Sequence, residues 1–217
     1  MCGLLAILDT PRSGARAAAH AARGEELIDR LRHRGPDQRG TLALPHAWLG
    51  HRRLAIVSPE TGEQPCVCGP AGRRTAWVTN SEIFNHAALR PLCGALPDSE
   101  SDSAVIGPIV DRFGLDGVGM LDGQFALVVA REDRPDWIAA RDHAGICPLF
   151  AGFHADGTMW FASEMKCLID DCERVEIVEP GTAWVRDASG VRLDRWYDPA
   201  WAHATPGAPA DPDQLRE

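Results

Sequence analysis

Hydrophobic residues recur along this chain in short runs, and turn-forming residues separate one run from the next. Runs that are rich in β-branched or aromatic side chains predict β-strands, and the Gly, Pro, Asn and Asp between them predict turns. The predicted strands are Leu4–Leu8, Trp48–Val57, Thr75–Thr79, Gln124–Ala130, Trp137–Arg141, Met159–Ala162, Val175–Ile177 and Thr182–Val185. The pattern therefore predicts a chain that is mostly β.

Three segments have the composition of helices instead. Residues Ala15–Leu31 are rich in Ala, Leu, Arg and Glu, which favour a surface helix, and Gly35-Pro36 would end it. A second helix is predicted over Ser103–Phe113, with a kink or a late start at Gly107-Pro108, and a third over Ser163–Ile169. Strand runs interrupted by a few helices predict an α+β fold in which helices pack on sheets.

Composition narrows the class of protein. The chain has 217 residues, of which 45% are hydrophobic and 24% are charged, as in an ordinary globular protein of one large or two small domains. Its formal net charge of -9 argues against nucleic acid or an anionic membrane as a partner, because both require clustered Lys and Arg. No run approaches the roughly 18 apolar residues of a membrane span.

Seven cysteines predict a reducing environment. Their number is odd, the chain is not small, and the first ten residues do not resemble a signal peptide, so we expect free thiols and a cytoplasmic location. Cys66 and Cys68 are close in sequence, but no second pair and no histidine lies at a zinc-like spacing from them. We therefore expect no metal site.

The last stretch of the chain differs from the rest. Residues 198–213 are rich in Pro and lack hydrophobic periodicity, which predicts a linker, and Gln214–Glu217 could begin a helix. We predict one domain over residues 1–197, and over 198–217 a Pro-rich linker that leads into a further domain.

Cys2 is the first candidate for chemistry. Aminopeptidases remove Met1 when the second residue is small, and the chain would then carry a thiol and a free α-amino group on one residue. An α-amino group titrates near ~7.7–8.0 and a thiol near ~8.5, so the amine can accept the proton of the thiol. This is the arrangement of a nucleophile activated by its own N-terminal amine. Taken alone, a chance cysteine at this position is an equal alternative.

Eight segments, in order along the chain, carry a family resemblance. They are MCGLLAI (1–7), RHRGPD (32–37), GHRRLAIV (50–57), NSEIFNH (80–86), SD (101–102), LDGQFA (121–126), RDHAGICPLF (141–150) and FASEMK (161–166). Together they resemble the glutaminase domain of glutamine-hydrolysing asparagine synthetase, a class II glutamine amidotransferase of the N-terminal-nucleophile hydrolase superfamily. The resemblance implies a four-layer αββα sandwich of two mainly antiparallel sheets flanked by helices.

The resemblance also implies how glutamine would be held. Arg53 would bind the α-carboxylate, and the alternative for this residue is a surface arginine. Asp102, with Glu82, would face the α-ammonium group; the alternative for Asp102 is an N-cap of the following helix, and both roles are compatible. Ile56 and Val57 would complete the substrate-binding residues.

For catalysis, the resemblance makes Cys2 the nucleophile and the Asn80 amide an oxyanion donor. The second donor would be the backbone N–H of Ser81, where the family has Gly. If that position needs a positive φ, Ser81 would be strained, and crowding there would impair the oxyanion site. None of the four nearby histidines is implied as a base, so hydrogen-bonding or packing roles are expected for His33, His51, His86 and His143.

The implied activity is hydrolysis of glutamine to glutamate and ammonia, with ammonia passed to an ATP-dependent synthetase domain or partner. ATP and Mg²⁺ are expected only in that domain, because this chain contains no GxxxxGK[ST] motif, and no cofactor is expected here. One alternative is a catalytically impaired docking or regulatory module, and another is an amidotransferase for an acceptor other than aspartate. The acceptor and the oligomeric state are left open, with a homodimer as one candidate.

Overall fold

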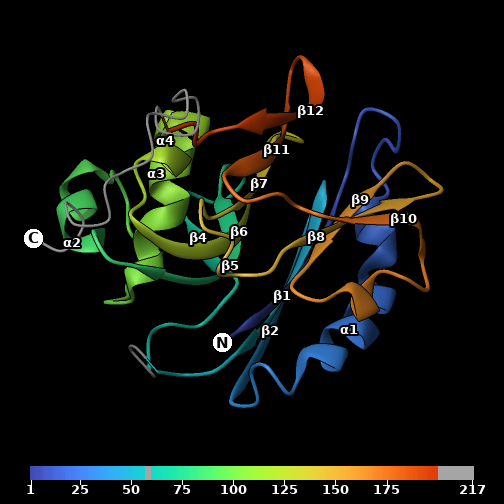
Figure 1. Ribbon diagram of the computed structural model, residues 1–217, viewed down its shortest axis with the longest axis horizontal. Helices are drawn as coiled ribbons and strands as arrows, with labels where there is room; N and C mark the ends of the chain where they lie inside the picture. The colour runs from blue at the N-terminus through green and yellow to red at the C-terminus, as the bar shows by residue number, and fades with distance from the viewer. Residues whose placement is uncertain (57–59, 200–217) are drawn as a thin grey trace, which may run out of the picture.

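Two six-stranded antiparallel sheets face each other in the computed structural model, which describes residues 1–56 and 60–199 (Figure 1). The first sheet has the order β10-β8-β9-β1-β3-β2. Its strands are β1 (Gly3–Leu8), β2 (Gln38–Leu44), β3 (Ala47–Arg53), β8 (Phe150–His154), β9 (Met159–Ala162) and β10 (Cys172–Ile177). The second sheet has the order β12-β11-β7-β6-β5-β4. Its strands are β4 (Cys66–Cys68), β5 (Thr75–Ile83), β6 (Gly123–Arg131), β7 (Trp137–Arg141), β11 (Thr182–Asp187) and β12 (Gly190–Arg195).

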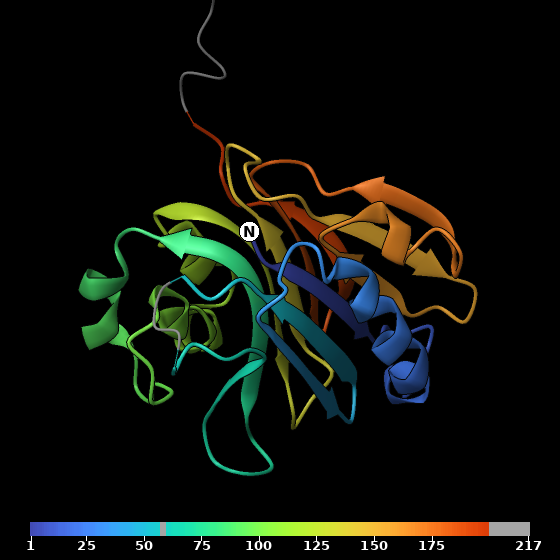
Figure 2. The ribbon, with the colours of Figure 1, turned by 90° about the horizontal axis from the view of Figure 1, so that it is seen from below.

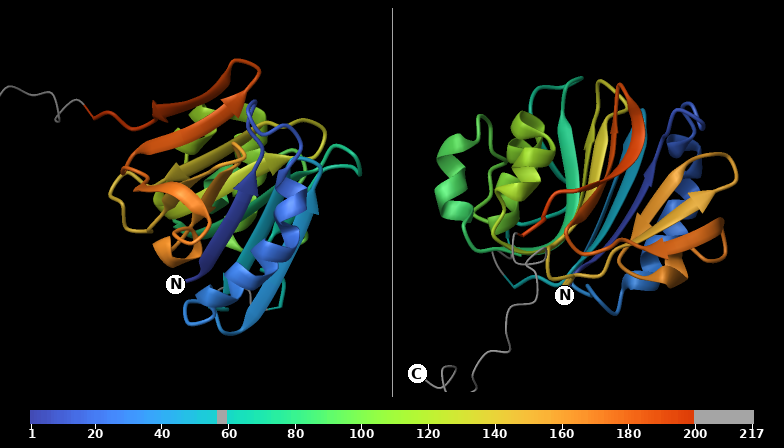
Figure 3. Two further views of the ribbon diagram at one scale, coloured as in Figure 1. Left: turned by 90° about the vertical axis from the view of Figure 1, so that its right-hand side faces the viewer. Right: turned by 45° about the horizontal axis from the view of Figure 1, so that its top comes forward.

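Helices cover the two outer faces of this sandwich (Figures 2 and 3). The first sheet is covered by α1 (Ala21–Ile28), with the 3₁₀ turns η1 (Ala17–His20) and η2 (Asp29–Leu31) at its ends. On the outer side of the second sheet lie α2 (His86–Leu89), η3 (Arg90–Leu92), η4 (Asp102–Val105), α3 (Ile106–Phe113) and α4 (Leu115–Gly119). The order helix, sheet, sheet, helix confirms the predicted αββα sandwich.

Three hydrophobic layers hold these elements together, and β1 contributes to two of them. Leu4 and Leu8 belong to the core between the sheets, whereas Leu5 and Ile7 belong to the core under α1. Successive side chains of a strand point to opposite faces, so a continuous apolar run such as that of β1 suits a strand covered on both sides. This burial fixes the strand that follows Cys2.

The third layer packs the second sheet against α3. Trp77 on β5 is fully buried there, and its Nε1–H donates to the carbonyl of Ser103 at 3.0 Å. A Cβ at Gly107 would lie 2.1 Å from the Trp77 ring, so only glycine allows the helix to approach so closely. The late helix start predicted near Gly107-Pro108 is confirmed, because α3 begins at Ile106 after the turn η4.

Several predicted elements differ from the structure. The predicted strand Trp48–Val57 ends at Arg53, and Val57 lies outside the described residues. The helix predicted over Ser163–Ile169 is wrong, since only the 3₁₀ turn η5 (Met165–Cys167) forms before β10. Strands β2, β4, β8 and β12 were not predicted, because they are short or carry polar residues on an exposed face.

Most of the predictions for the C-terminal segment concern residues that the structure does not describe. Residues 200–217, including the helix predicted at Gln214–Glu217, lie outside the described residues, so the boundary after residue 197 stays a prediction. The backbone N–H groups of Trp196 and Tyr197 both donate to the carbonyl of Gly181, which holds these two residues against the start of β11. Within the described ranges, every helix is too short or too polar to cross a membrane.

Candidate active site

Cys2 lies between the two sheets, immediately before β1, which is an interior strand of the first sheet. Gly3, the next residue, pairs with Arg52 near the end of β3, which brings the chain beyond β3 beside Cys2. The backbone N–H of Leu54 donates to Cys2 Sγ at 3.4 Å, and Sγ lies 3.8 Å from the Leu54 carbonyl oxygen. Arg34 Nε–H donates to the carbonyl of Cys2 at 2.9 Å. These contacts hold the backbone of Cys2 and its sulfur in one orientation.

Asn80 reaches Cys2 from the opposite sheet. The backbone N–H of Cys2 donates to Asn80 Oδ1 at 2.9 Å, across 78 residues of sequence. The amide nitrogen Nδ2 of Asn80 is buried and has no hydrogen-bond partner. A buried donor without a partner costs about 1–3 kcal/mol, so this amide group is ready to donate to an acceptor that enters beside Cys2.

One cavity of about 170 Å³ collects the predicted site residues. Its lining includes seven of the eight, and the eighth, Val57, lies outside the described residues. The seven are Cys2, Arg53, Ile56, Asn80, Ser81, Glu82 and Asp102. Met1 also lines this cavity and is 62% exposed. The tertiary structure therefore brings together residues spread over a hundred positions.

Opposite charges occur on the cavity wall. Arg53 is buried, and its NH1 group donates to Gln38 Oε1 at 2.7 Å. Asp102 Oδ2 accepts a hydrogen bond from the backbone N–H of Ile83 at 2.7 Å, and the more exposed Glu82 accepts one from Gln124 at 3.2 Å. A wall with a guanidinium group and two carboxyl groups matches a ligand with one negative and one positive end.

The alternative role considered for Asp102 is wrong. The N-cap residue of η4 is Ser101, and Asp102 is the first residue of that turn. Its carboxylate is tied to β5 through Ile83, which fixes Asp102 beside the cavity. The alternative that Arg53 is a surface arginine is wrong as well, since this residue is only 5% exposed.

Ser81 has ordinary strand geometry. It lies inside β5 in register with Phe125 of β6, so its backbone is extended and has no need of the positive φ that would favour glycine. Its Oγ atom is buried without a hydrogen-bond partner. The strain expected from replacing glycine at this position is therefore absent.

His51 has a hydrogen-bonding role, as expected. It is buried on β3, and its Nε2 lies 2.9 Å from the carbonyl oxygen of Thr79. Burial, together with the charge of Arg53, lowers the pKa of His51 to about 4. The imidazole is thus neutral near pH 7, donates from Nε2, and links the two sheets beneath the cavity.

The loop carrying the RHRGPD motif packs close to the site. Arg34 joins the Cys2 carbonyl to Glu164, and Asp37 accepts a hydrogen bond from the backbone N–H of Ala55 at 2.8 Å. A Cβ at Gly35 would lie 2.2 Å from backbone atoms of Arg52, so glycine is required for this approach. The motif therefore has a structural role that positions Cys2.

Two contributors to the site were missed by the sequence reasoning. Leu54 acts through its backbone, and a backbone contact leaves no side-chain signal, although the residue lies inside the GHRRLAIV motif. Gln64 lines the cavity and accepts a hydrogen bond from the backbone N–H of Thr79 at 2.7 Å. Among the described residues, the cavity wall holds no converging group of His, Cys, Asp and Glu suited to a metal.

The fold is an α+β sandwich of the αββα type, and the cavity that contains Cys2 lies at the start of β1. A solved structure of glutamine phosphoribosylpyrophosphate amidotransferase from B. subtilis has the same fold, with a TM-score of 0.71 and 20% identity over 90% of this chain and 49% of that one. The model of the glutamine amidotransferase domain family matches residues 1–183. The chain belongs to this family.

Named relatives agree with this membership. The chain is 41% identical to asparagine synthetase [glutamine-hydrolyzing] 2 of Oryza sativa subsp. japonica and 42% identical to asparagine synthetase [glutamine-hydrolyzing] 3 of Arabidopsis thaliana. Both alignments cover 100% of this chain but only 36% of the relative. The chain thus spans about a third of the length of these synthetases.

Proposed function

We propose that this chain hydrolyses glutamine to glutamate and ammonia through a thioester on Cys2. The thiolate attacks the side-chain amide carbon, and collapse of the tetrahedral intermediate releases ammonia and leaves a γ-glutamyl thioester. Water then cleaves the thioester, which frees glutamate and restores the thiol. The observation that carries the proposal is the unpartnered, buried amide of Asn80 beside Cys2.

Asn80 has the role of an oxyanion donor in this proposal. Its Nδ2–H group would donate to the oxygen on which negative charge develops, and the backbone N–H of Ser81 is the second donor. Such donors stabilise the transition state most when they are already oriented and shielded from water. The bond from Cys2 N–H to Asn80 Oδ1 provides this orientation.

The base is the α-amino group of Cys2 after removal of Met1. In the unprocessed chain the Cys2 nitrogen belongs to a peptide bond and cannot accept a proton. Removal of Met1 converts it into an amine on the same residue as the thiol and also clears a side chain from the cavity wall. The proton of the thiol can then move to this amine and from there to the departing ammonia.

The charges on the wall set the direction in which glutamine enters. Arg53 would pair with the α-carboxylate, since its planar guanidinium matches a carboxylate with two parallel hydrogen bonds. Asp102 and Glu82 would face the α-ammonium group, and the exposed Ile56 would border the entrance. This grip presents the side-chain amide, and no other carbonyl, to Cys2.

The ammonia would serve an ATP-dependent synthetase domain, joined to this domain after residue 197 or present as a separate partner. The relatives named above support this part of the proposal, because each is a glutamine-hydrolysing asparagine synthetase of which this chain covers 36%. ATP and Mg²⁺ would bind in that domain, and aspartate would be the acceptor, with other acceptors as the alternative. The seven free thiols suit a cytoplasmic location.

Labelling with 6-diazo-5-oxo-norleucine, a reactive glutamine analogue, tests the proposal. We expect intact-mass analysis to show a chain without Met1 that gains one adduct on Cys2, and we expect the unlabelled chain to release glutamate from glutamine. Cys2→Ala should lose both properties, whereas the matched variant Cys93→Ala, which changes another partly buried thiol, should keep them. Retention of Met1 in an active enzyme, or labelling in Cys2→Ala, would contradict the mechanism.

The alternative of an impaired docking module rested on Ser81. Because Ser81 is extended within β5, we expect Ser81→Gly to change kcat/KM by less than about threefold and to lower stability by about 0.5–1 kcal/mol, the usual cost of glycine in a strand. A large gain of activity in Ser81→Gly would show that serine crowds the oxyanion site and would favour the impaired module.

A further inference from the structure

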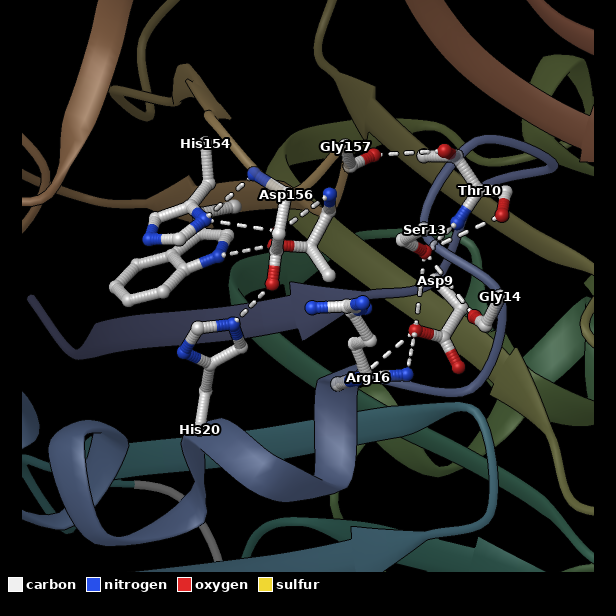
Figure 4. Close-up of polar contacts among 12 residues, drawn as sticks. Asp9, Thr10, Ser13, Gly14, Arg16, His20, His154, Asp156 and Gly157 are labelled. Carbon is white, nitrogen blue, oxygen red and sulfur yellow. Dashed lines mark hydrogen bonds and ion pairs between the residues drawn. The ribbon is translucent and has the colours of Figure 1, made fainter.

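A second polar cluster lies at the opposite end of β1 from Cys2 (Figure 4). It joins His20, the last residue of η1, to His154 and Asp156 at the turn between β8 and β9. His20 Nε2 lies 2.8 Å from Asp156 Oδ2, and His154 Nδ1 lies 2.8 Å from Asp156 Oδ1. The atoms of these three residues that can bind a metal all lie within 4.8 Å of one another. One carboxylate therefore bridges two imidazoles from distant segments.

Neighbouring groups hold each of the three side chains in place. The backbone N–H and the Oγ1–H of Thr158 donate to Asp156 Oδ1 at 3.0 and 2.8 Å. The buried ring of Trp160 stacks on His154, with a centroid distance of 5.3 Å, and contacts the edge of His20 at 5.1 Å. Trp160 Nε1–H in turn donates to Thr158 Oγ1 at 2.9 Å. Hydrogen bonds behind the ligands are a regular feature of metal sites in proteins.

The charge of the cluster suits a cation. Asp156 brings a carboxylate, which carries one negative charge, and the two histidines bring imidazole nitrogens that can bind a metal. Each nitrogen–oxygen contact of 2.8 Å is a hydrogen-bond distance, shorter than the separation of two atoms that bind one tetrahedral metal ion. His154 Nδ1 also accepts a hydrogen bond from the backbone N–H of Asp156 at 3.2 Å. The side chains are 15–21% exposed, which leaves access from solvent.

We propose that His20, His154 and Asp156 bind a divalent transition-metal ion of the Zn²⁺ type. Two imidazole nitrogens and one carboxylate are a borderline-soft donor set that favours Zn²⁺ over Ca²⁺ or Mg²⁺. Tetrahedral Zn²⁺ with bonds of about 2.0–2.2 Å places its ligand atoms roughly 3.3–3.6 Å apart, so small side-chain rotations within the observed cluster suffice. Water would fill the fourth position on the exposed side.

The ion would have a structural role. It would join the segment that leads into α1 to the β8–β9 hairpin, replacing the His20–Asp156 hydrogen bond that now connects them. Cys2 lies before the first residue of β1, whereas this cluster lies beyond the last one, so the ion would not touch the glutamine cavity. We expect bound metal to raise the melting temperature and to leave glutamine hydrolysis unchanged.

Titration with Co²⁺ as a spectroscopic substitute tests the site in the Cys2→Ala chain, which lacks the thiol proposed as the nucleophile. One equivalent of Co²⁺ should give visible d–d absorption of a four-coordinate site without the near-ultraviolet bands of cobalt–thiolate bonds, and Zn²⁺ should displace it. Thr158→Val should weaken binding by about 10–100-fold, as loss of a hydrogen bond behind a ligand does, and His154→Ala by more. His46→Ala is the matched control, because His46 pairs with Asp9 and is not one of the three proposed ligands, and it should bind normally.

X-ray absorption of the Zn²⁺-loaded wild-type chain identifies the types of ligand bound to the metal, and it does not depend on whether a variant folds. Two imidazoles with oxygen supports the site, and a sulfur-containing shell overturns it. Co²⁺ spectra that stay the same in His154→Ala and Asp156→Asn would also overturn it. Glutaminase activity is measured separately on chains with an intact Cys2, so failure of the proposed reaction and failure of the metal site remain distinguishable.

Discussion

The amide of Asn80 makes one hydrogen bond in the resting protein and has an unused donor. Asn80→Ala removes both, and the two losses have opposite effects on stability. Loss of the bond from Cys2 N–H costs about 0.5–1.5 kcal/mol, whereas removal of a buried donor without a partner relieves about 1–3 kcal/mol. The side chain lines an existing cavity, so its truncation leaves no new enclosed void. We expect the free energy of unfolding to change by less than about 1 kcal/mol.

The effect on catalysis should be much larger. In the proposed transition state, Asn80 Nδ2 donates to the developing oxyanion, and removal of one such donor costs about 2.7–4 kcal/mol, or about 10²–10³ in kcat. Binding of glutamine depends mainly on Arg53 and Asp102, so KM should change little. Asn80→Ala should therefore combine a large loss of activity with only a small change in the free energy of unfolding.

The assay compares glutamate release with urea unfolding for Asn80→Ala and a control, Asn85→Ala. Both hydrogen-bonding groups of Asn85 are paired, since Nδ2 donates to the Met120 carbonyl and Oδ1 accepts from the Asp122 N–H. The control should lose about 1–3 kcal/mol of stability for its two hydrogen bonds and keep its kcat. The reasoning is refuted if Asn80→Ala keeps kcat within about threefold of wild type, or if it loses as much stability as the control.

Two other residues give predictions of different kinds. Arg53→Lys should raise KM for glutamine about tenfold or more with a smaller effect on kcat, because a charge-assisted hydrogen bond of about 1.5–3 kcal/mol is lost; steady-state kinetics with an unchanged KM would contradict the clamp. Burial lowers the pKa of His51 from 6.5 in the unfolded chain to about 4 in the folded protein. As the pH falls below 6.5, His51 is therefore protonated in the unfolded chain but stays neutral in the folded one. Its contribution to the free energy of unfolding is complete above pH 6.5 and is lost as the pH falls toward 4. The loss amounts to about 3 kcal/mol and should be absent in His51→Gln, so equal pH dependence of urea unfolding in both proteins would disprove it.

Local patterns in the amino-acid sequence predict the parts of this protein that depend on near neighbours. The apolar run of β1, the α+β class and the late start of α3 near Gly107-Pro108 follow from side-chain periodicity and backbone restrictions. Cys2 stands out because the proposed nucleophile and its base lie on this one residue. Edge strands such as β2 and β4 were missed because an exposed face weakens the hydrophobic alternation that identifies a strand.

Contacts between distant segments were decided by the tertiary structure. Sheet register and the packing of one sheet on the other bring Asn80 to Cys2 and leave its amide without a partner. The same packing gives Ser81 an extended backbone, and it brings His20 to Asp156 across 136 residues. Such contacts depend on many weak interactions that must be satisfied together across the whole chain. They therefore cannot be predicted from the residues that are near neighbours in sequence.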